Sequence, residues 1–411
     1  MRSRFKLIDL FSGCGGLSDG FEQTHLYETL ACIEWEKEPC NTLIKRLKKK
    51  WGYENASEMV FQFDIQRTKE LIYGWEGDST FSTGIGLKEI VKKKGELDVL
   101  IGGPPCQAYS IAGRIRDKNG MNDDYRNFLF ESYLKVVSFF KPKAIIFENV
   151  PGLLSANPGG VSIAERITCE FAKSGYIITN DLKTDALIDC TRYGVPQARK
   201  RMAILGVRKD KIKGNPYEAL KDFYGTILPG YKSENISTVK DAINDLPKLH
   251  PLKQPIRIQS RNYSHKLGST TIPNHLPRMH SKRDIATFQL LTDDIESGQN
   301  KYSSVDSLKE LYFEITGKRS NIHKYHVLKW DKPSNTIPAH LYKDGLRHIH
   351  PDPKQARTIT VREAARLQSF DDDFEFSGSL TDQYKMVGNA VPPKFAKAIA
   401  LALNDFINKY Y

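Results

Sequence analysis

The chain has 411 residues, of which 40% are hydrophobic, so it is long enough for two domains or for one large domain with an insertion. Its formal net charge of +12 favours a polyanionic partner, nucleic acid first and a membrane surface second, although charge alone fits an unliganded basic surface equally well. Six scattered cysteines without a Cys-x-x-Cys pair argue against a disulfide framework or a zinc knuckle, and the charged N-terminus and short apolar runs argue against a signal peptide and a membrane span.

The first predicted strand covers residues 5–10 and is followed by Gly13-Cys14-Gly15-Gly16 and a helical pattern. Strand, glycine turn and helix in this order open the nucleotide-binding unit of a doubly wound α/β fold. Ser18 stands where Gly-x-Gly-x-x-Gly has its third glycine, which disfavours a dinucleotide pyrophosphate as the ligand. A glycine turn alone is equally typical of a tight strand-to-helix connection.

The next two predicted strands, 30–33 and 60–63, end at Glu34-Trp35 and at Asp64-Ile65. An acidic residue about 20 positions after the glycine turn is placed to accept hydrogen bonds from ribose hydroxyls. Trp35 could stack on an adenine or could simply cover the sheet edge. Residues 41–50 predict a basic amphipathic helix, and residues 74–86 predict an irregular loop.

A fourth buried strand, 97–101, leads into Gly102-Gly103-Pro104-Pro105-Cys106-Gln107. Chemistry in open α/β sheets is placed on loops at the carboxyl ends of strands, and glycine and proline make this loop both close-fitting and rigid. A free thiol has a pKa of about 8.5, so a nucleophilic role for Cys106 needs oriented donors nearby. The alternative for a lone cysteine is a small buried hydrophobe. Residues 108–124 predict a mobile loop that closes as a lid, or else a surface connection.

The helix predicted at 125–140 is followed by a buried strand, 144–147, that ends in Glu148-Asn149-Val150. A glutamate beside an apolar strand end can have a raised pKa and act as a proton donor, whereas a capping or salt-bridged glutamate is the alternative. A helix is predicted at 163–171 and strands at 176–182 and 202–207. Before the last strand, Gln197, Arg199 and Arg201 alternate onto one face, which suits a carbonyl oxygen or phosphate, or a charged edge strand.

Taken together and in order, these segments resemble the cytosine-C5 DNA methyltransferases across nearly the whole chain. The segments that carry the resemblance are Asp9-Leu10-Phe11-Ser12-Gly13-Cys14-Gly15-Gly16, Glu34-Trp35, Asp64-Ile65, Gly103-Pro104-Pro105-Cys106-Gln107, Arg126 with Leu129-Phe130, Glu148-Asn149-Val150, Gln197-x-Arg199-x-Arg201, Arg362-Glu363-Ala364-Ala365-Arg366-Leu367-Gln368 and Gly388-Asn389-Ala390-Val391-Pro392-Pro393. Tyr109 and Asp371 depart from the residues that are frequent in the family, Phe and Pro.

The resemblance implies a Rossmann-like α/β domain that binds S-adenosylmethionine and methylates C5 of a flipped cytosine in double-stranded DNA. It implies four catalytic residues: Cys106 as the nucleophile that adds to C6, Glu148 at the ring N3, and Arg201 with Arg199 at O2. It implies a cofactor site formed by Phe11, Gly13, Gly15, Glu34, Trp35, Asp64, Ile65, Pro104, Asn389 and Val391. It also places Gln107, Ser110 and Arg114 against DNA.

Residues 1–207 would form the catalytic domain, residues 208–325 a smaller target-recognition domain, and residues 326–411 a return segment with a C-terminal helix at 393–407 that packs on the first strand–helix unit. Within 208–325, Arg261, Asn262 and Arg278 are the candidate base readers, since arginine pairs with guanine and asparagine with adenine. The histidines at 323, 326, 340, 348 and 350 have no tight carboxylate spacing, so we expect no metal site. With eight residues before Asp9, we expect a stand-alone bacterial or phage enzyme of the cytoplasm and nucleoid, with a separate cognate restriction endonuclease.

Three other interpretations remain at this point. An RNA cytosine methyltransferase would share the cofactor and the basic charge, an inactive DNA-binding relative would share the fold, and a nicotinamide oxidoreductase would share the glycine turn. The glycine spacing disfavours the last, and the presence of Cys106, Glu148 and Arg201 disfavours the second.

Overall fold

A computed structural model describes residues 4–104, 129–155, 162–258, 260–268, 271–343 and 345–411. The chain forms two compact units. The first unit comprises Met1–Gly194, Arg199–Asn235 and Ala390–Tyr411, and the second comprises Val195–Ala198 and Ile236–Asn389. The main segment of the second unit therefore begins and ends later than the 208–325 segment expected for target recognition, and a short piece before it, Val195–Ala198, also belongs to this unit.

Specific contacts explain both differences in the boundaries. Residues 208–235 stay with the first unit because the Tyr224 hydroxyl accepts a bond from the Leu205 amide at 2.7 Å and donates to the Ala203 carbonyl at 2.9 Å. Residues 326–389 belong to the second unit because Val327, Ile349 and Ala356 share an apolar core with Phe288, Leu291 and Leu311.

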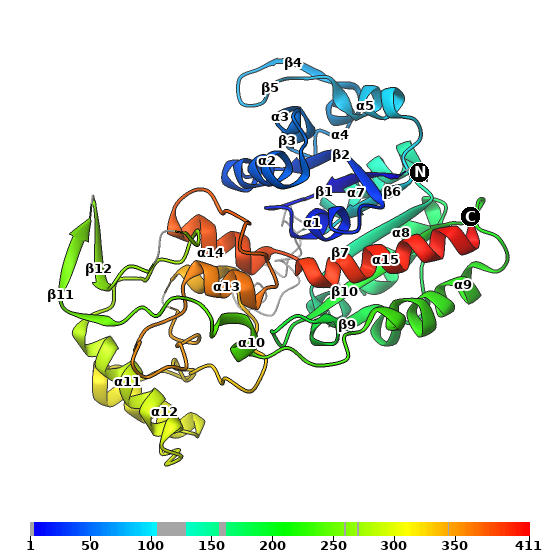
Figure 1. The fold of residues 1–411 in the computed structure, drawn as a ribbon. Coiled ribbons are helices and arrows are strands. Elements are labelled where there is room, and N and C mark those ends of the chain that lie inside the picture. Colours follow the sequence, from blue (N-terminus) through cyan, green and yellow to red (C-terminus); the bar gives the residue numbers. More distant parts are fainter. Residues whose placement is uncertain (1–3, 105–128, 156–161, 259, 269–270, 344) are drawn as a thin grey trace. The chain divides into compact units, whose positions relative to one another are not determined.

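The first unit is built on a mainly parallel sheet with strand order β3-β2-β1-β6-β7-β10-β8, with β9 paired to β10 (Figure 1). Its strands are β1 (Phe5–Leu10), β2 (Tyr27–Glu34), β3 (Val60–Gln62), β6 (Val99–Gly102), β7 (Ala144–Asn149), β8 (Tyr176–Ile177), β9 (Leu187–Asp189) and β10 (Lys200–Arg208). Near-continuous apolar runs form the central strands, as parallel strands covered on both faces require. β10 runs antiparallel to β7, so the beginning of β10 and the end of β7 lie at the same edge.

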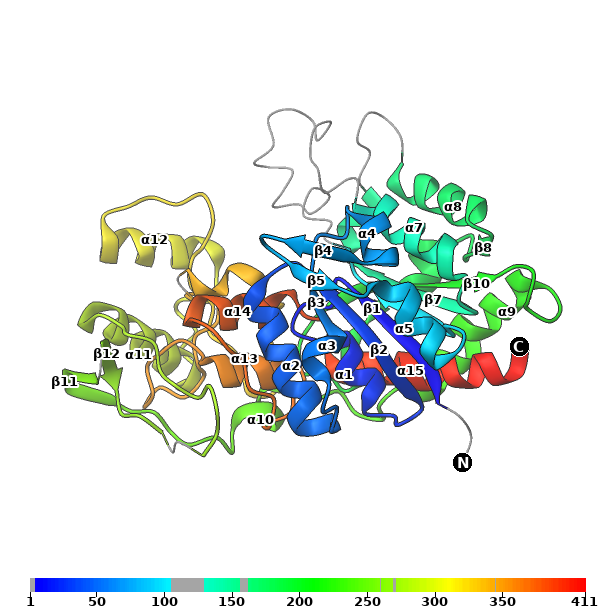
Figure 2. The same cartoon turned by 90° about the horizontal axis from the view of Figure 1, so that it is seen from above.

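Helices cover both faces of this sheet, which confirms the doubly wound class (Figure 2). They are α1 (Gly16–Glu22), α2 (Lys37–Trp51), α3 (Ala56–Met59), α4 (Thr68–Tyr73), α5 (Gly86–Lys94), α7 (Leu129–Phe140), α8 (Ile163–Lys173), α9 (Pro216–Asp222) and α15 (Pro393–Tyr410). α4, α5, α7 and α8 share one large apolar core with alternate strand residues, whereas α1, α2 and α15 lie on the opposite face.

The C-terminal helix α15 packs on α1, as predicted (Figure 1). Gly20 of α1 lies so close that a Cβ atom there would be 2.4 Å from the Ala396 Cβ. The Tyr27 hydroxyl of β2 donates to the Ala400 carbonyl at 2.7 Å. These contacts bring the first and last segments of the chain together on one face of the sheet.

Two local predictions are wrong. Residues 74–86 contain a hairpin, β4 (Trp75–Asp78) and β5 (Ser82–Gly84), because the Asp78 carboxylate accepts the amides of Thr80 and Phe81 at 2.8 Å and so stabilises the turn. Residues 176–182 form only the short β8. Residues 178–181 have no regular secondary structure, and a π-helical turn (Leu182–Ala186), started by the Asp181 side chain accepting the Thr184 amide, begins at the last residue of that run.

The second unit contains a two-stranded ribbon and five α-helices among its described residues. They are β11 (Pro251–Ile258), β12 (Arg261–His265), α10 (Val239–Ile243), α11 (Lys282–Glu296), α12 (Val305–Thr316), α13 (Val361–Leu367) and α14 (Leu380–Asn389). One apolar core of this unit forms between α11, α12 and the segment around Ile349.

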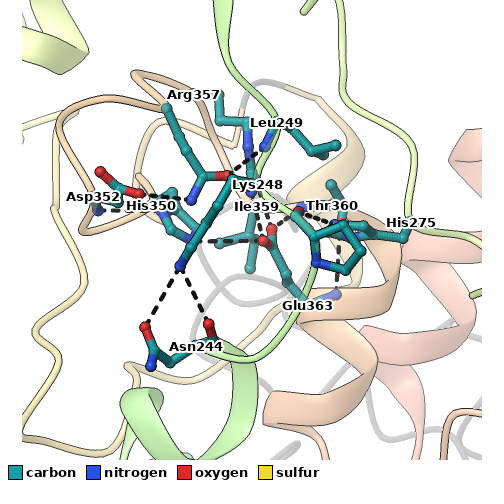
Figure 3. A network of polar contacts seen from close by, with 12 residues as sticks. Asn244, Lys248, Leu249, His275, His350, Asp352, Arg357, Ile359, Thr360 and Glu363 are labelled. Atoms are coloured by element: carbon teal, nitrogen blue, oxygen red, sulfur yellow. Dashed lines mark hydrogen bonds and ion pairs between the residues drawn. The ribbon is translucent and has the colours of Figure 1, made fainter. Parts of the chain in front are cut away.

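A buried polar network holds the middle of the second unit together (Figure 3). At the first turn of α13, the Glu363 carboxylate accepts two bonds from the Arg357 guanidinium, at 2.6 and 2.7 Å, and one from the Thr360 amide at 2.7 Å. His350 lies 3.5 Å from the same carboxylate, and His275 bonds to the Thr360 hydroxyl at 3.0 Å. Glu363 of the Arg-Glu-Ala-Ala-Arg motif is therefore the acceptor at the centre of this buried network.

Candidate active site

The Glu34 carboxylate is tied to the glycine turn by backbone amides. The Gly13 N–H donates to Oε2 at 2.8 Å, and the N–H groups of Trp35 and Glu36 donate to Oε1, each at 2.8 Å. Burial raises the pKa of Glu34, and the amides of Glu36 and Gly13 oppose that shift. Oε2 accepts one described bond and can accept another from a hydroxyl, so the group suits a sugar.

The turn itself needs unusual backbone conformations. Phe11, Gly13 and Gly15 all have positive φ, at 61°, 56° and 94°. A Cβ at Gly15 would lie 2.5 Å from the Leu43 Cδ1, whereas a Cβ at Gly13 would meet nothing within 4 Å. Glycine at 15 is thus required by packing as well as by φ, while the backbone of Gly13 borders open space that a ligand can approach.

An exposed aromatic ring and two further residues lie near the ends of β2 and β3. The Trp35 side chain is 59% exposed, with its ring centroid 5.9 Å from that of Phe81 in an edge contact. Asp64 accepts the Gln66 amide at 2.9 Å, and Ile65 is buried. An open indole face, a carboxylate and an approachable backbone fit a ligand that combines a purine, a ribose and a polar tail.

The segment after β6 lies directly against the end of β7. A Cβ at Gly103 would be 2.7 Å from Glu148 Oε2, so any larger residue there would displace the carboxyl group. The Asn149 side-chain amide donates to the Pro104 carbonyl at 3.2 Å, and its oxygen accepts the Val150 amide at 2.8 Å. Two neighbouring strand ends are thereby locked together, with Glu148 between them.

Arg201, at the start of β10, completes this cluster. Its Nε lies 3.0 Å from Glu148 Oε1, and both side chains are largely buried. Burial raises the pKa of Glu148, and the guanidinium groups of Arg201 and Arg199 only partly oppose this. A carboxyl group with a raised pKa, next to a guanidinium at the carboxyl end of a parallel sheet, is suited to donate a proton to a bound ring.

Arg199 and Gln197 do not share a free face with Arg201. Arg199 is 1% exposed, and its Nη2 donates to the Ala390 carbonyl at 3.0 Å, beside buried Val391. Gln197 belongs to the second unit, where its Oε1 accepts the Ile337 amide at 3.0 Å and its Nε2 donates to the Leu367 carbonyl at 3.3 Å. The expected three-residue face is therefore wrong for Gln197.

Comparison with known proteins agrees with this geometry. The family model of the C-5 cytosine-specific DNA methylases matches residues 5–405. The type II methyltransferase M.Bpa9945I of Bacillus paralicheniformis is 34% identical over 98% of this chain and 100% of its own length. M1.HphI of Haemophilus parahaemolyticus, also a type II methyltransferase, is 32% identical over 96% of this chain and 86% of its own.

The chain belongs to the C-5 cytosine-specific DNA methylase family. Solved structures agree on the fold: an E. coli prophage protein assigned as a DNA modification methyltransferase has a TM-score of 0.61 at 23% identity, over 98% of this chain and 99% of that one. The Dnmt2 methyltransferase of S. pombe has a TM-score of 0.53 at 14% identity, over 99% of both chains. Membership supports the DNA cytosine interpretation and none of the three alternatives, and it implies the use of S-adenosylmethionine.

Several residues expected in a member of this family lie outside the described part of the chain. They are Cys106, Gln107, Ser110 and Arg114, together with the 108–124 segment expected as a lid. Pro104 is described and buried. Asn389 ends α14 in the second unit, whereas Val391 belongs to the first.

The three expected base readers differ in how free they are. Asn262 is exposed on β12, and the Arg261 guanidinium lies 5.4 Å from the centroid of the Tyr263 ring. Arg278 instead donates to the carbonyls of Leu341 and Tyr342 and lies over Tyr384. These bonds hold the Arg278 side chain against the backbone of the second unit, so we infer a structural role for Arg278 rather than the expected reading role.

Two contributors to the site were missed in the sequence. The Glu148-Asn149-Val150 motif does not indicate that the Asn149 side chain ties Pro104 to β7. The irregular loop predicted at 74–86 gives no role to Phe81, whose ring lies against Trp35. The Asp78-Ser79-Thr80 stretch, with a carboxylate two residues before an amide it caps, was the available signal for that turn.

Described residues include no group of three or more His, Cys, Asp or Glu side chains arranged to hold a metal ion. Within the same ranges, no helix has the length and apolarity needed to cross a bilayer.

Proposed function

We propose that this chain is a sequence-specific DNA (cytosine-5)-methyltransferase that moves a methyl group from S-adenosylmethionine to C5 of a cytosine in double-stranded DNA. The contact of the Glu148 carboxyl with both the Arg201 guanidinium and the backbone at Gly103 supports this most, because Gly103 lies three positions before Cys106. It is the arrangement that activation of a pyrimidine ring toward a thiolate requires.

In this proposal Glu148 and Arg201 both draw electron density from the cytosine ring, Glu148 at N3 and Arg201 at O2. Protonated Glu148 donates its proton to the ring N3, and Arg201 donates a hydrogen bond to O2 while its Nε stays paired with Glu148. Both interactions draw electron density from the ring, so the Cys106 thiolate can form a bond to C6. The electron pair reaches C5, which becomes the nucleophile.

The rest of the turnover returns the enzyme to its starting state. S-adenosylmethionine, when bound, would supply the methyl group that C5 takes, and its S–CH3 bond would break to leave S-adenosylhomocysteine as the second product. A base then removes the proton from C5, the bond between Cys106 and C6 breaks, and the thiolate leaves. The proton at N3 returns to Glu148. Arg199 acts as a positioning residue, because its guanidinium holds the carbonyl of Ala390.

The cofactor would be held by the turn and strand ends described above. Glu34 accepts hydrogen bonds from the ribose, Trp35 stacks on the adenine, and Asp64 with Ile65 lies beside that base. Phe11, Gly13 and Gly15 line the amino-acid end, and Pro104, Asn389 and Val391 complete the site. The open space beside Gly13 and the exposed indole ring support this assignment.

The target cytosine has to leave the helical stack, because C5 and C6 inside a duplex are beyond the reach of a side chain. We assign residues 108–124 as the lid over the flipped base, with Gln107, Ser110 and Arg114 against the DNA. The second unit, with Arg261 and Asn262, would select the sequence. In the cell we expect the chain to modify DNA in the bacterial nucleoid or during phage growth, beside a cognate restriction endonuclease that acts separately.

The test uses purified full-length chain with isotope-labelled S-adenosylmethionine, a duplex DNA library and RNA of matched composition. We expect methyl transfer to C5 of cytosine at one recurrent sequence in duplex DNA. Cys106→Ser should abolish transfer while cofactor affinity, measured by calorimetry, stays within about twofold. The control Cys169→Ser changes an exposed cysteine on α8 and should leave transfer unchanged. Transfer to RNA but not to DNA would refute the substrate, and equal turnover by Cys106→Ser would refute the nucleophile.

A further inference from the structure

The ribbon of β11 and β12 lies in an unusually basic part of the second unit. From residue 246 to residue 283 the chain contains no Asp or Glu and eight Lys or Arg residues. On β11 every side chain from Lys253 to Ile258 is exposed, and Pro255 in its middle fits a strand with one unpaired edge. A basic ribbon with an open strand complements a polyanion.

Pairing across the ribbon sets which side chains share a face. Arg257 is directly opposite Asn262, whereas Ile256 is opposite Tyr263 and Ile258 is opposite Arg261. Directly opposed residues in an antiparallel pair point to the same side. Arg257 and Asn262 therefore stand next to each other on one face.

The two faces of the ribbon differ in how they are used. On one face, Tyr263 is buried and the Arg261 guanidinium lies over its ring, with Ile256 and Ile258 beside them. On the other face, Arg257 and Asn262 are both exposed, and neither side chain makes a hydrogen bond or ion pair within the described ranges. One face thus carries the Arg261–Tyr263 contact and two exposed isoleucines, and the other presents a free guanidinium and a free amide.

We propose that the ribbon enters the major groove of the substrate DNA and that Arg257 and Asn262 read two neighbouring base pairs, Arg257 at a guanine and Asn262 at an adenine. This inference rests on the proposed function. The major groove is about 12 Å wide and admits a two-stranded ribbon. Arginine binds the O6 and N7 of guanine in a bidentate manner, and asparagine does the same with N6 and N7 of adenine.

Arg257 takes the place of Arg278 as the arginine that reads a base. Both lie within residues 246–283, which contain no Asp or Glu, but the Arg278 guanidinium donates hydrogen bonds to the carbonyls of Leu341 and Tyr342. Arg257 has no such partner among the described residues, and it stands beside an amide with complementary specificity.

The test compares the methylated sequences produced by four full-length proteins on a randomised duplex library: wild type, Arg257→Gln, Asn262→Asp and the control Lys282→Gln. Lys282 is an exposed basic residue in the same acid-free stretch but off the ribbon. Arg257→Gln should lose about tenfold or more in discrimination at one G·C pair of the site and little at the others. Asn262→Asp should lose its preference for adenine at an adjacent position and favour cytosine, whose N4 amino group a carboxylate accepts.

The outcomes separate this inference from the proposed function. If wild type methylates no cytosine in any duplex, the proposed function fails. If wild type methylates a defined sequence and both ribbon variants keep that sequence at every position, the ribbon is not the reader. A uniform loss of activity with Arg257→Gln across all sequences, with a smaller salt dependence, would assign Arg257 to phosphate instead and overturn the inference. Lys282→Gln should keep the wild-type sequence, and thermal melting shows that all four proteins are folded.

Discussion

Among the described residues, two buried glutamate–arginine pairs differ in the direction in which the pKa of the glutamate is shifted. Glu363 in the second unit receives two bonds from Arg357, one from the Thr360 amide and a nearby His350. Although burial favours its neutral form, these groups hold the pKa of Glu363 well below its usual range. Glu148 in the first unit has a single contact with Arg201, at 3.0 Å, and burial raises its pKa.

The number of donors around the carboxyl group explains the difference. A carboxylate with several donors to both oxygens is fixed in its charged form and acts as a structural anchor. A buried carboxyl with one guanidinium contact stays able to hold a proton, which is what donation to a substrate ring needs. The same residue pair thus supports packing in one unit and chemistry in the other.

The largest expected effect is the loss of kcat when Glu148 can no longer donate a proton. Glu148→Gln keeps the shape of the side chain but has no transferable proton, so kcat should fall about 100- to 10,000-fold. Because the amide is neutral, stability should be unchanged or slightly higher, as measured by urea denaturation. Turnover within threefold of wild type would show that Glu148 is no proton donor and would remove the contrast.

Glu363→Gln should do the reverse. It leaves the Arg357 guanidinium buried without its counter-charge, which costs about 3–5 kcal/mol of unfolding free energy. The double variant Glu363→Gln with Arg357→Met removes the unpaired charge and should recover part of that loss. Denaturant unfolding of the three proteins measures both effects. A change below about 1 kcal/mol in the single variant would contradict the anchoring role.

The two units should also respond differently to pH. Burial lowers the pKa of His265 and His348 to about 4 and that of His280 to about 3, all in the second unit. Between these lowered values and the ordinary histidine pKa of 6.5, the unfolded chain binds more protons than the folded chain. The stability that depends on these neutral histidines is therefore complete above pH 6.5 and is lost as pH falls toward 4. Each can remove up to about 1.4 kcal/mol per pH unit.

Asp9 of β1 has the opposite sign. Burial raises its pKa from 3.8 to about 8, with Ser18 partly opposing, so the folded first unit binds the extra proton and loses stability as pH rises from about 4 to 8. Hydrogen exchange at pH 5 and pH 8 tests both units at once. Amides of α13 should lose protection at pH 5, and those of β1 should not. An equal loss of amide protection at pH 5 in α13 and in β1 would contradict the assignment of these pKa shifts to the two units.

The smallest expected effect concerns the backbone beside Glu148. Gly103→Ala places a methyl group 2.7 Å from Glu148 Oε2, so the carboxyl must move. Misplacement of a catalytic group of this size should lower kcat about 10- to 100-fold with KM nearly unchanged. Gly230→Ala is a control for the loss of a glycine, because a Cβ there meets nothing within 4 Å and the backbone has no positive φ. Similar kinetics for Gly103→Ala and wild type would mean that the carboxyl is not held by this contact.

Much of the fold and of the first-unit site could be predicted from the chain alone. Apolar runs that end in Glu34, Gly103 and Glu148 are visible in the sequence, and parallel strands bring such ends to one edge. The hairpin at Trp75–Gly84 could not be predicted in the same way, because it depends on one capping carboxylate and an aromatic ring packed over Gly84.

Partners distant in the sequence explain the other misses. Gln197 has the spacing of a ligand-facing residue, but Ile337 and Leu367 take its amide group. Arg278 has the composition of a base reader, but carbonyls more than 60 residues away hold it. Arg257 was missed because only the register of the ribbon shows that it stands beside Asn262.

The most direct test of the central claim is trapping of the nucleophile on duplex DNA that contains 5-fluorocytosine at the methylated position. Fluorine at C5 blocks the last proton removal, so the enzyme stays bonded to C6. With S-adenosylmethionine present, peptide mass spectrometry should find the modified base on Cys106 in wild type and a much slower adduct in Glu148→Gln. No adduct on any duplex sequence, or one on Cys169, would contradict the account.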